Sequence, residues 1–154
     1  MEKYRGSDER VTIPDTVEVV GESAFENNQK VQFVVIPKSV KRLDAYVFWG
    51  CNNLEEVVLG KGLTTVDEYS FAGCTGLKQI TIPENVQSIE AQAFAGCTNL
   101  TDIYIPATVT NIADDAFLNC DNVTIHADEG SVAAQFAQKL EEQRRKNPLV
   151  TAAP

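Results

Sequence analysis

Histidine is nearly absent from this chain: His126 is the only one, and no cysteine has a sequence signature that pairs it with this residue, which argues against catalysis by a histidine acid or base. The four cysteines do not form a zinc motif either. These stand 23 residues apart, whereas zinc ligands usually come in close pairs. We therefore expect no enzyme activity, no metal site and no cofactor.

Long apolar runs and basic residues are also scarce. No stretch approaches the roughly 20 apolar residues of a transmembrane helix, so no membrane insertion is expected. Thirteen Lys and Arg against 22 Asp and Glu give a formal charge of −9, which repels a phosphate backbone and argues against nucleic acid as a partner.

The residues that follow Met1 lack the apolar core of a signal peptide. If Met1 is the native start, a cytoplasmic protein is expected. If a signal peptide has been removed, the expected location is extracellular or at the cell surface.

What the sequence does contain is a repeat with a period of 23 residues. Such a period indicates a solenoid, because one repeat cannot bury its apolar side alone and must stack on its neighbours. When the repeats are aligned, three positions always carry an aliphatic residue. The most regular position carries the phenylalanines Phe25, Phe48, Phe71, Phe94 and Phe117.

The cysteines form a column of the same repeat, at Cys51, Cys74, Cys97 and Cys120, with Asn28 in the first copy. Neighbouring strands are close enough that distance alone does not exclude a disulfide between coils. We expect free, buried thiols instead, because side chains aligned in a ladder point parallel to one another.

Each repeat is expected to begin with a short strand. In the third copy Leu54, Val57 and Leu59 point inward, and the strand ends at Gly60, where other copies have a proline such as Pro83. A turn and a second inward pair, Leu63 and Val66 in this copy, then follow.

A short helical turn is predicted next, for instance from Glu68 to Ala72, terminated by Gly73. Asp44 and Asp67 have the position and side chain of helix N-caps.

The segment from Ile82 to Leu100 carries Ile-Pro, Ala-Phe and Gly-Cys pairs at constant offsets, and it resembles the unit of BspA-like leucine-rich repeats. The resemblance spans roughly residues 11 to 126. It implies an α/β repeat solenoid, a right-handed superhelix with short parallel strands on the concave face and short helical turns on the convex face. It also implies a bacterial surface protein involved in adhesion.

Four segments are predicted from this pattern. Residues 1–10 form an N-terminal extension, 11–126 the leucine-rich repeat solenoid, 127–146 a capping helix and 147–154 a flexible tail. The solenoid closes with a shortened strand at 123–126. Ser131 is the expected N-cap of the helix, and Val132, Phe136 and Leu140 form the apolar stripe that covers the open end of the core.

The binding surface is predicted on the concave sheet, where side chains between the inward ones project outward. Phe33, Val35 and Val58 are expected to be adjacent and exposed, and such an apolar patch can mark a contact site. The competing explanation is that these residues are simply good strand formers. The candidate ligand-binding residues are Phe33, Val35, Glu56, Val58, Gln79, Thr81, Asp102 and Tyr104.

Trp49 is a second unusual residue, because a large ring stands where other copies have small ones. It is expected either on the convex side as a second contact or packed over a neighbouring repeat.

The sequence favours a non-catalytic protein-binding module whose partner is a protein. The alternative is a fragment of a bacterial cell-surface adhesin that binds a host matrix protein or glycan. A monomer or a weak edge-to-edge dimer is expected, since a free strand edge can pair with another chain.

Overall fold

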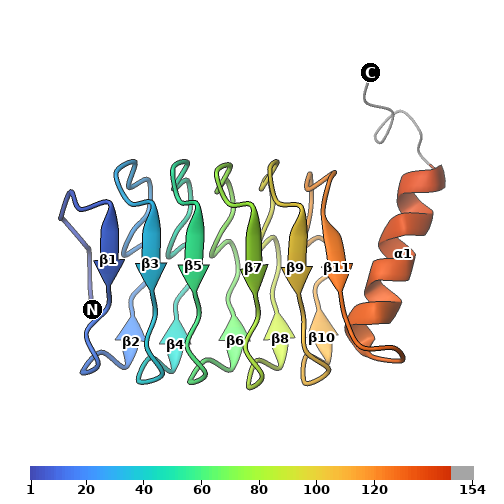
Figure 1. Cartoon of the computed structure of the whole chain (residues 1–154), viewed down its shortest axis with the longest axis horizontal. Helices are drawn as coiled ribbons and strands as arrows, with labels where there is room; N and C mark the ends of the chain where they lie inside the picture. The colour runs from blue at the N-terminus through green and yellow to red at the C-terminus, as the bar shows by residue number, and fades with distance from the viewer. Residues whose placement is uncertain (147–154) are drawn as a thin grey trace.

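The computed structural model describes residues 1–146, and Figure 1 shows them as a row of stacked coils followed by one helix. The predicted tail, residues 147–154, lies outside the described residues. The arrangement is a β-solenoid of about five turns with parallel strands.

Each coil begins with a three-residue strand, and these strands lie side by side as the first strand column. The middle residue points inward, so that Val34 is 1% and Ile103 0% exposed, while the flanking residues face outward. The strands are β1 (Arg10–Thr12), β3 (Phe33–Val35), β5 (Glu56–Val58), β7 (Gln79–Thr81), β9 (Asp102–Tyr104) and β11 (Thr124–His126).

The structure has a second strand column that was not predicted. The burial of its inward residues was predicted. Two-residue strands follow the turn of each coil, and the expected inward pair, Leu63 and Val66, is buried. All pairings in both columns are parallel. The strands are β2 (Val19–Val20), β4 (Arg42–Leu43), β6 (Thr65–Val66), β8 (Ser88–Ile89) and β10 (Asn111–Ile112).

The phenylalanine column runs through the core as a continuous stack of rings. Phe71 is fully buried, and its ring centroid lies 5.3 Å from that of Phe48 and 5.3 Å from that of Phe94. Both ends of the stack are closed by aromatic rings from outside the repeats. Tyr4 stacks on Phe25 at 4.9 Å, and Phe136 lies 5.9 Å from Phe117.

The four cysteines are free and buried, as predicted. Each thiol donates a hydrogen bond to the carbonyl oxygen of a phenylalanine in the preceding coil, at 2.7 to 3.2 Å. In the first coil Asn28 takes this position, and its Oδ1 accepts from the amide of Val31 at 3.1 Å. The column therefore satisfies carbonyl groups of the preceding turns, and these four cysteines form no disulfide.

The predicted helical turns are wrong. Where a helical turn was predicted, some backbone amides bond within the same turn and others bond to the next coil. The Trp49 N–H donates to the carbonyl oxygen of Tyr46 at 3.1 Å, whereas the Phe48 N–H donates to the carbonyl oxygen of Ser70 at 2.8 Å. Tyr46 and Tyr69 also have left-handed φ angles of 63° and 58°, which no α-helix contains. Asp44 does not cap a helix, because its carboxylate accepts from Arg42 Nε at 2.6 Å.

We call this third side of the coils the turn ladder. It comprises residues 21–27, 44–50, 67–73, 90–96 and 113–119, whose backbones are hydrogen-bonded from one coil to the next.

Both strand columns are interrupted in the middle of the stack, and we call this interruption the seam. Within residues 1–146, the hydrogen-bonded pairing of the first column stops between β5 and β7, and that of the second column stops between β4 and β6. Figure 1 shows wider spacings at both places. The turn from Leu59 to Thr64 therefore connects a strand paired toward the N-terminus with a strand paired toward the C-terminus.

Gly62 allows this turn to lie against the preceding coil. A Cβ atom at this position would collide with the backbone carbonyl of Lys38 and lie 2.6 Å from the carbonyl oxygen of Val40. Gly60, where other coils have proline, makes a similarly close approach to the carbonyl oxygen of Ile36, at 2.5 Å.

We expect Gly62→Ala to lower the free energy of unfolding by about 1 to 3 kcal/mol, the usual cost of forcing packed backbone apart. Urea denaturation measures the change. The matched control is Thr16→Ala, at the same repeat position in an exposed turn, with an expected change within about 0.5 kcal/mol. Equal stability of the Gly62→Ala variant and the parent would contradict the close approach.

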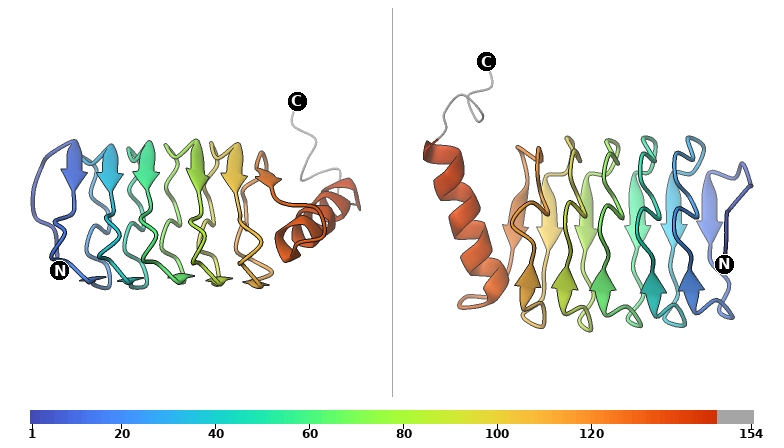
Figure 2. Two further views of the ribbon diagram at one scale, coloured as in Figure 1. Left: turned by 60° about the horizontal axis from the view of Figure 1, so that its bottom comes forward. Right: turned by 180° about the vertical axis from the view of Figure 1, so that it is seen from behind.

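The helix α1 (Val132–Lys146) closes the C-terminal end, next to β11 in Figure 2. Ser131 is its N-cap, as predicted, because its Oγ accepts from the amide of Ala134 at 3.1 Å. Phe136 and Leu140 pack on the core, and Ala133 is fully buried. Arg144 adds hydrogen bonds to the carbonyl oxygens of Cys120 and Val123, at 2.7 and 3.0 Å, so the helix also covers free backbone groups.

Candidate functional site

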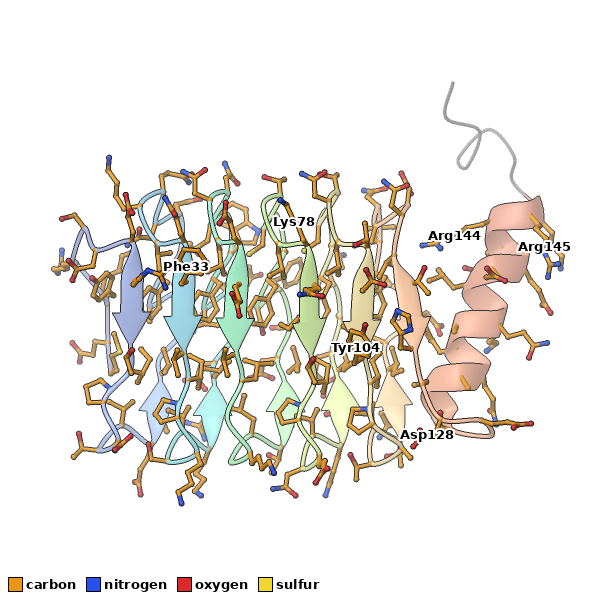
Figure 3. The ribbon with its side chains drawn as sticks, viewed as in Figure 1. Phe33, Lys78, Tyr104, Asp128, Arg144 and Arg145 are labelled. Carbon is orange, nitrogen blue, oxygen red and sulfur yellow. The ribbon has the colours of Figure 1, made fainter. Side chains whose placement is uncertain are left out.

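The outward side chains of the first strand column form one surface, which we call the sheet face. Strand pairing places them in two rows, and Figure 3 shows Phe33 and Tyr104 on strands toward opposite ends of this face. One row consists of Arg10, Phe33, Glu56, Gln79, Asp102 and Thr124. The other consists of Thr12, Val35, Val58, Thr81, Tyr104 and His126. All eight predicted binding residues thus lie on this face.

The apolar part of the sheet face is centred on β3 and β5. Val35 and Val58 are paired neighbours and are 39% and 49% exposed. Phe33 differs from the prediction, since it is half-buried. The guanidinium of Arg10 lies over its ring, 4.2 Å from the centroid. Arg10 is not among the eight residues predicted from the sequence, although strand pairing places it beside Phe33.

A groove of about 440 Å³ lies on the sheet face at the seam. Four of the predicted residues contribute to it: Glu56 and Val58 from β5, and Gln79 and Thr81 from β7. Among the described residues no pairing joins these two strands, so their facing edges offer backbone groups beside the apolar side chain of Val58. The groove is therefore a recess with both apolar and hydrogen-bonding character.

The opposite end of the sheet face holds a cluster of stacked rings and hydrogen bonds. Tyr104 stacks on His126 with ring centroids 4.4 Å apart, and His126 Nε2 lies 2.8 Å from Asp102 Oδ1. Hydrogen bonds from His126 and from Thr101 lower the pKa of the Asp102 carboxyl group. His126 was predicted only as part of the terminal strand, yet its register with Tyr104 places it on this face.

Trp49 lies on the turn ladder and is 38% exposed. The strand pairings do not bring it to the sheet face. Trp49 is therefore exposed among the turns and is not packed over a neighbouring repeat on the sheet face.

No described helix combines the length and apolarity needed to cross a membrane. Among residues 1–146, no group of three or more His, Cys, Asp or Glu side chains is placed to hold a metal ion.

A family model described as BspA type leucine rich repeat region matches residues 4–124 in six copies. A search of curated proteins found no match.

Several solved structures are similar over most of the chain. A leucine rich cell surface protein from Faecalibacterium prausnitzii A2-165 is 34% identical, with a TM-score of 0.81, over 88% of this chain and 36% of that one. A leucine-rich repeat protein from Bacteroides ovatus is 30% identical, with a TM-score of 0.71, over 77% of this chain and 33% of that one. The leucine rich repeat protein of T. pallidum is 27% identical, with a TM-score of 0.77, over 80% of this chain and 61% of that one. The chain thus spans about a third of the first two proteins.

Proposed function

The chain belongs to the BspA-type leucine-rich repeat family, and from this we propose that it is a non-catalytic module that binds a protein partner through the sheet face. The observation that carries the proposal is the position of the seam groove beside the exposed pair Val35 and Val58. An extended segment of a partner could place an apolar side chain against these valines and bond to the strand edges of β5 and β7.

The rest of the sheet face supports a protein partner more than a small ligand. Polar and charged groups surround the valines, from Arg10 at one end to the Asp102–His126 pair at the other. An apolar centre with a polar rim is the usual composition of a protein interface. This surface is the one that the resemblance assigns to the concave side of the solenoid.

Charging the apolar centre is expected to abolish partner binding while the fold persists. The variant Val35→Asp/Val58→Asp places two carboxylates where the partner would have to desolvate them, so capture of the partner from a native extract should fall at least about tenfold. Capture on immobilised protein followed by mass spectrometry measures the change.

The matched control is Thr64→Asp/Thr110→Asp, which adds the same charge at exposed positions outside the first strand column. Circular dichroism establishes that both variants are folded. Undiminished capture by the valine variant would exclude the sheet face as the binding surface.

A second candidate is a fragment of a cell-surface adhesin that binds host matrix protein or glycan. The name of the similar Faecalibacterium protein, a leucine rich cell surface protein, favours it. Protease treatment of intact cells of the native organism separates the two candidates. Loss of the chain from treated cells supports the adhesin, and its retention in the soluble fraction supports an intracellular module.

A further inference from the structure

The turn ladder carries a strong charge of one sign. Its five segments contain eight acidic residues and no lysine or arginine, so most of the chain's net charge of −9 lies on one of its three sides. Arg42, which belongs to β4, pairs with one of these carboxylates, that of Asp44, at 2.6 Å. The acidic residues are Glu22, Glu26, Asp44, Asp67, Glu68, Glu90, Asp114 and Asp115.

Aromatic rings interrupt this acidic surface at its N-terminal half. The rings of Tyr46 and Tyr69 stack in parallel, with centroids 4.8 Å apart and an interplanar angle of 2°. Trp49 belongs to the same turn as Tyr46, since its amide donates to the Tyr46 carbonyl at 3.1 Å, and it is 38% exposed. Three partly exposed aromatic residues thus belong to the acidic turn ladder.

The backbone conformation does not require aromatic residues at these two positions. Both have left-handed φ angles, a conformation that bulky side chains disfavour. The equivalent positions in the first and fourth coils have the same backbone conformation with Ser23 and Gln92. A small or polar residue therefore satisfies the turn, so the backbone conformation alone does not require the two aromatic rings.

The stack also lies in a negative electrostatic environment. Partial burial raises the pKa of the Tyr46 hydroxyl, and so do the Tyr69 hydroxyl and the carboxylates of Glu68, Glu22 and Glu26. A positive charge brought to this surface would be attracted by the carboxylates and by the electron-rich ring faces together.

We propose that the turn ladder around Tyr46, Tyr69 and Trp49 docks an arginine- and lysine-rich segment of a partner protein. Guanidinium groups stack on aromatic rings and form charge-assisted hydrogen bonds with carboxylates, and both kinds of partner are present here. An apolar segment would have to desolvate the carboxylates without compensation, and an acidic one would be repelled. This surface is separate from the sheet face and does not rest on the function proposed for it.

The chain contains its own reporter for the test, because Trp49 is its only tryptophan. Titration with a short synthetic peptide rich in arginine and lysine should change the emission of Trp49 saturably, and a glutamate-rich peptide of equal length should not. The variant Tyr46→Ser/Tyr69→Gln places there the residues that other coils carry and keeps the reporter. We expect it to bind the basic peptide about tenfold more weakly, from the loss of two cation–π contacts.

Two charge variants distinguish a docking surface from general attraction to an acidic protein. Glu22→Gln/Glu26→Gln/Glu68→Gln removes three carboxylates around the stack. Glu9→Gln/Glu55→Gln/Glu84→Gln removes three exposed carboxylates elsewhere. The first should weaken binding about tenfold or more, and the second by less than about twofold, since isolated exposed charges contribute little.

Equal weakening by the two triple variants would overturn the proposal, as would full affinity of the tyrosine variant or the lack of a saturable signal with the parent chain. Circular dichroism of each variant, compared with the parent, establishes that a loss of binding is not a loss of fold.

Discussion

Replacing Phe71 by alanine is expected to lower the free energy of unfolding by about 3 to 5 kcal/mol. The ring is fully buried and lies between Phe48 and Phe94, with centroid distances of 5.3 Å on both sides. The substitution removes the buried surface of one ring and two stacking contacts, and it leaves a cavity that rigid neighbouring coils cannot fill.

Urea denaturation followed by circular dichroism measures this loss. The control is Leu118→Ala, which removes a side chain that is 46% exposed and should change stability by less than about 1 kcal/mol. If Phe71→Ala costs no more than Leu118→Ala, the aromatic stack does not contribute to stability as its burial indicates.

Alkaline pH is expected to destabilise the protein through Cys51 and Cys74 of the cysteine column. Burial raises the pKa of the Cys51 thiol from 9.0 to about 12, and burial also raises the pKa of Cys74 well above its usual range. The folded state therefore keeps these protons at a pH where the unfolded state releases them. Stability is complete below pH about 9 and falls as the pH rises toward 12.

For a single thiol the expected loss is about 1.4 kcal/mol per pH unit between pH about 9 and 12. Urea denaturation of the parent chain and of Cys51→Ala, in reducing buffer at a series of pH values, isolates the contribution of Cys51. Other titrating groups contribute equally to both proteins and cancel in the difference. The stability advantage of the parent should therefore be constant below pH 9 and shrink above it.

A difference that stays constant through the alkaline range would show that the Cys51 thiol titrates normally in the folded protein. A thiol-reactive dye provides a second readout. Native protein at neutral pH should react slowly at all four buried cysteines and rapidly after denaturation.

The strand columns and the core were predictable because each coil repeats the same inward residues. Leu54, Val57, Leu63 and Val66 are all buried, as their spacing indicated. The Phe71 ring and its equivalents lie in one stack for the same reason. The membership in the BspA-type family agrees with the resemblance seen in the segment from Ile82 to Leu100.

The helical turns could not be excluded from a single repeat, because the competing hydrogen bonds come from the next coil. Asp67 followed by Glu68 is a plausible helix start, and an isolated segment has only its own carbonyls to bond. In the stack, Phe71 N–H donates to Ala93 at 2.8 Å, and the chain at Tyr69 adopts a left-handed conformation. The interaction between coils therefore overrides local propensity.

The binding residues were predictable as a set on one face, but not their individual exposure. Alternation along the strand places Val35 and Val58 outward, and they are exposed. Phe33 is half-buried, and the guanidinium over its ring belongs to Arg10, in the coil before it. The seam groove depends on which strands fail to pair. The only sequence signal for it is the replacement of the usual proline by Gly60, with Gly62 two residues later.

The seam has a mechanical consequence. Hydrogen bonds between coils run along the axis of the stack. A force that pulls the two ends apart therefore acts on every contact between coils. The contacts with the fewest hydrogen bonds should stretch most. Where β5 faces β7 and β4 faces β6, the strand bonds are missing, but the backbone bonds of the turn ladder continue, as from Phe48 to Ser70. Bending should concentrate there, with the ladder as the pivot, and it would change the width of the groove between Val58 and Thr81. We therefore expect the coils on either side of the seam to move as two units relative to each other.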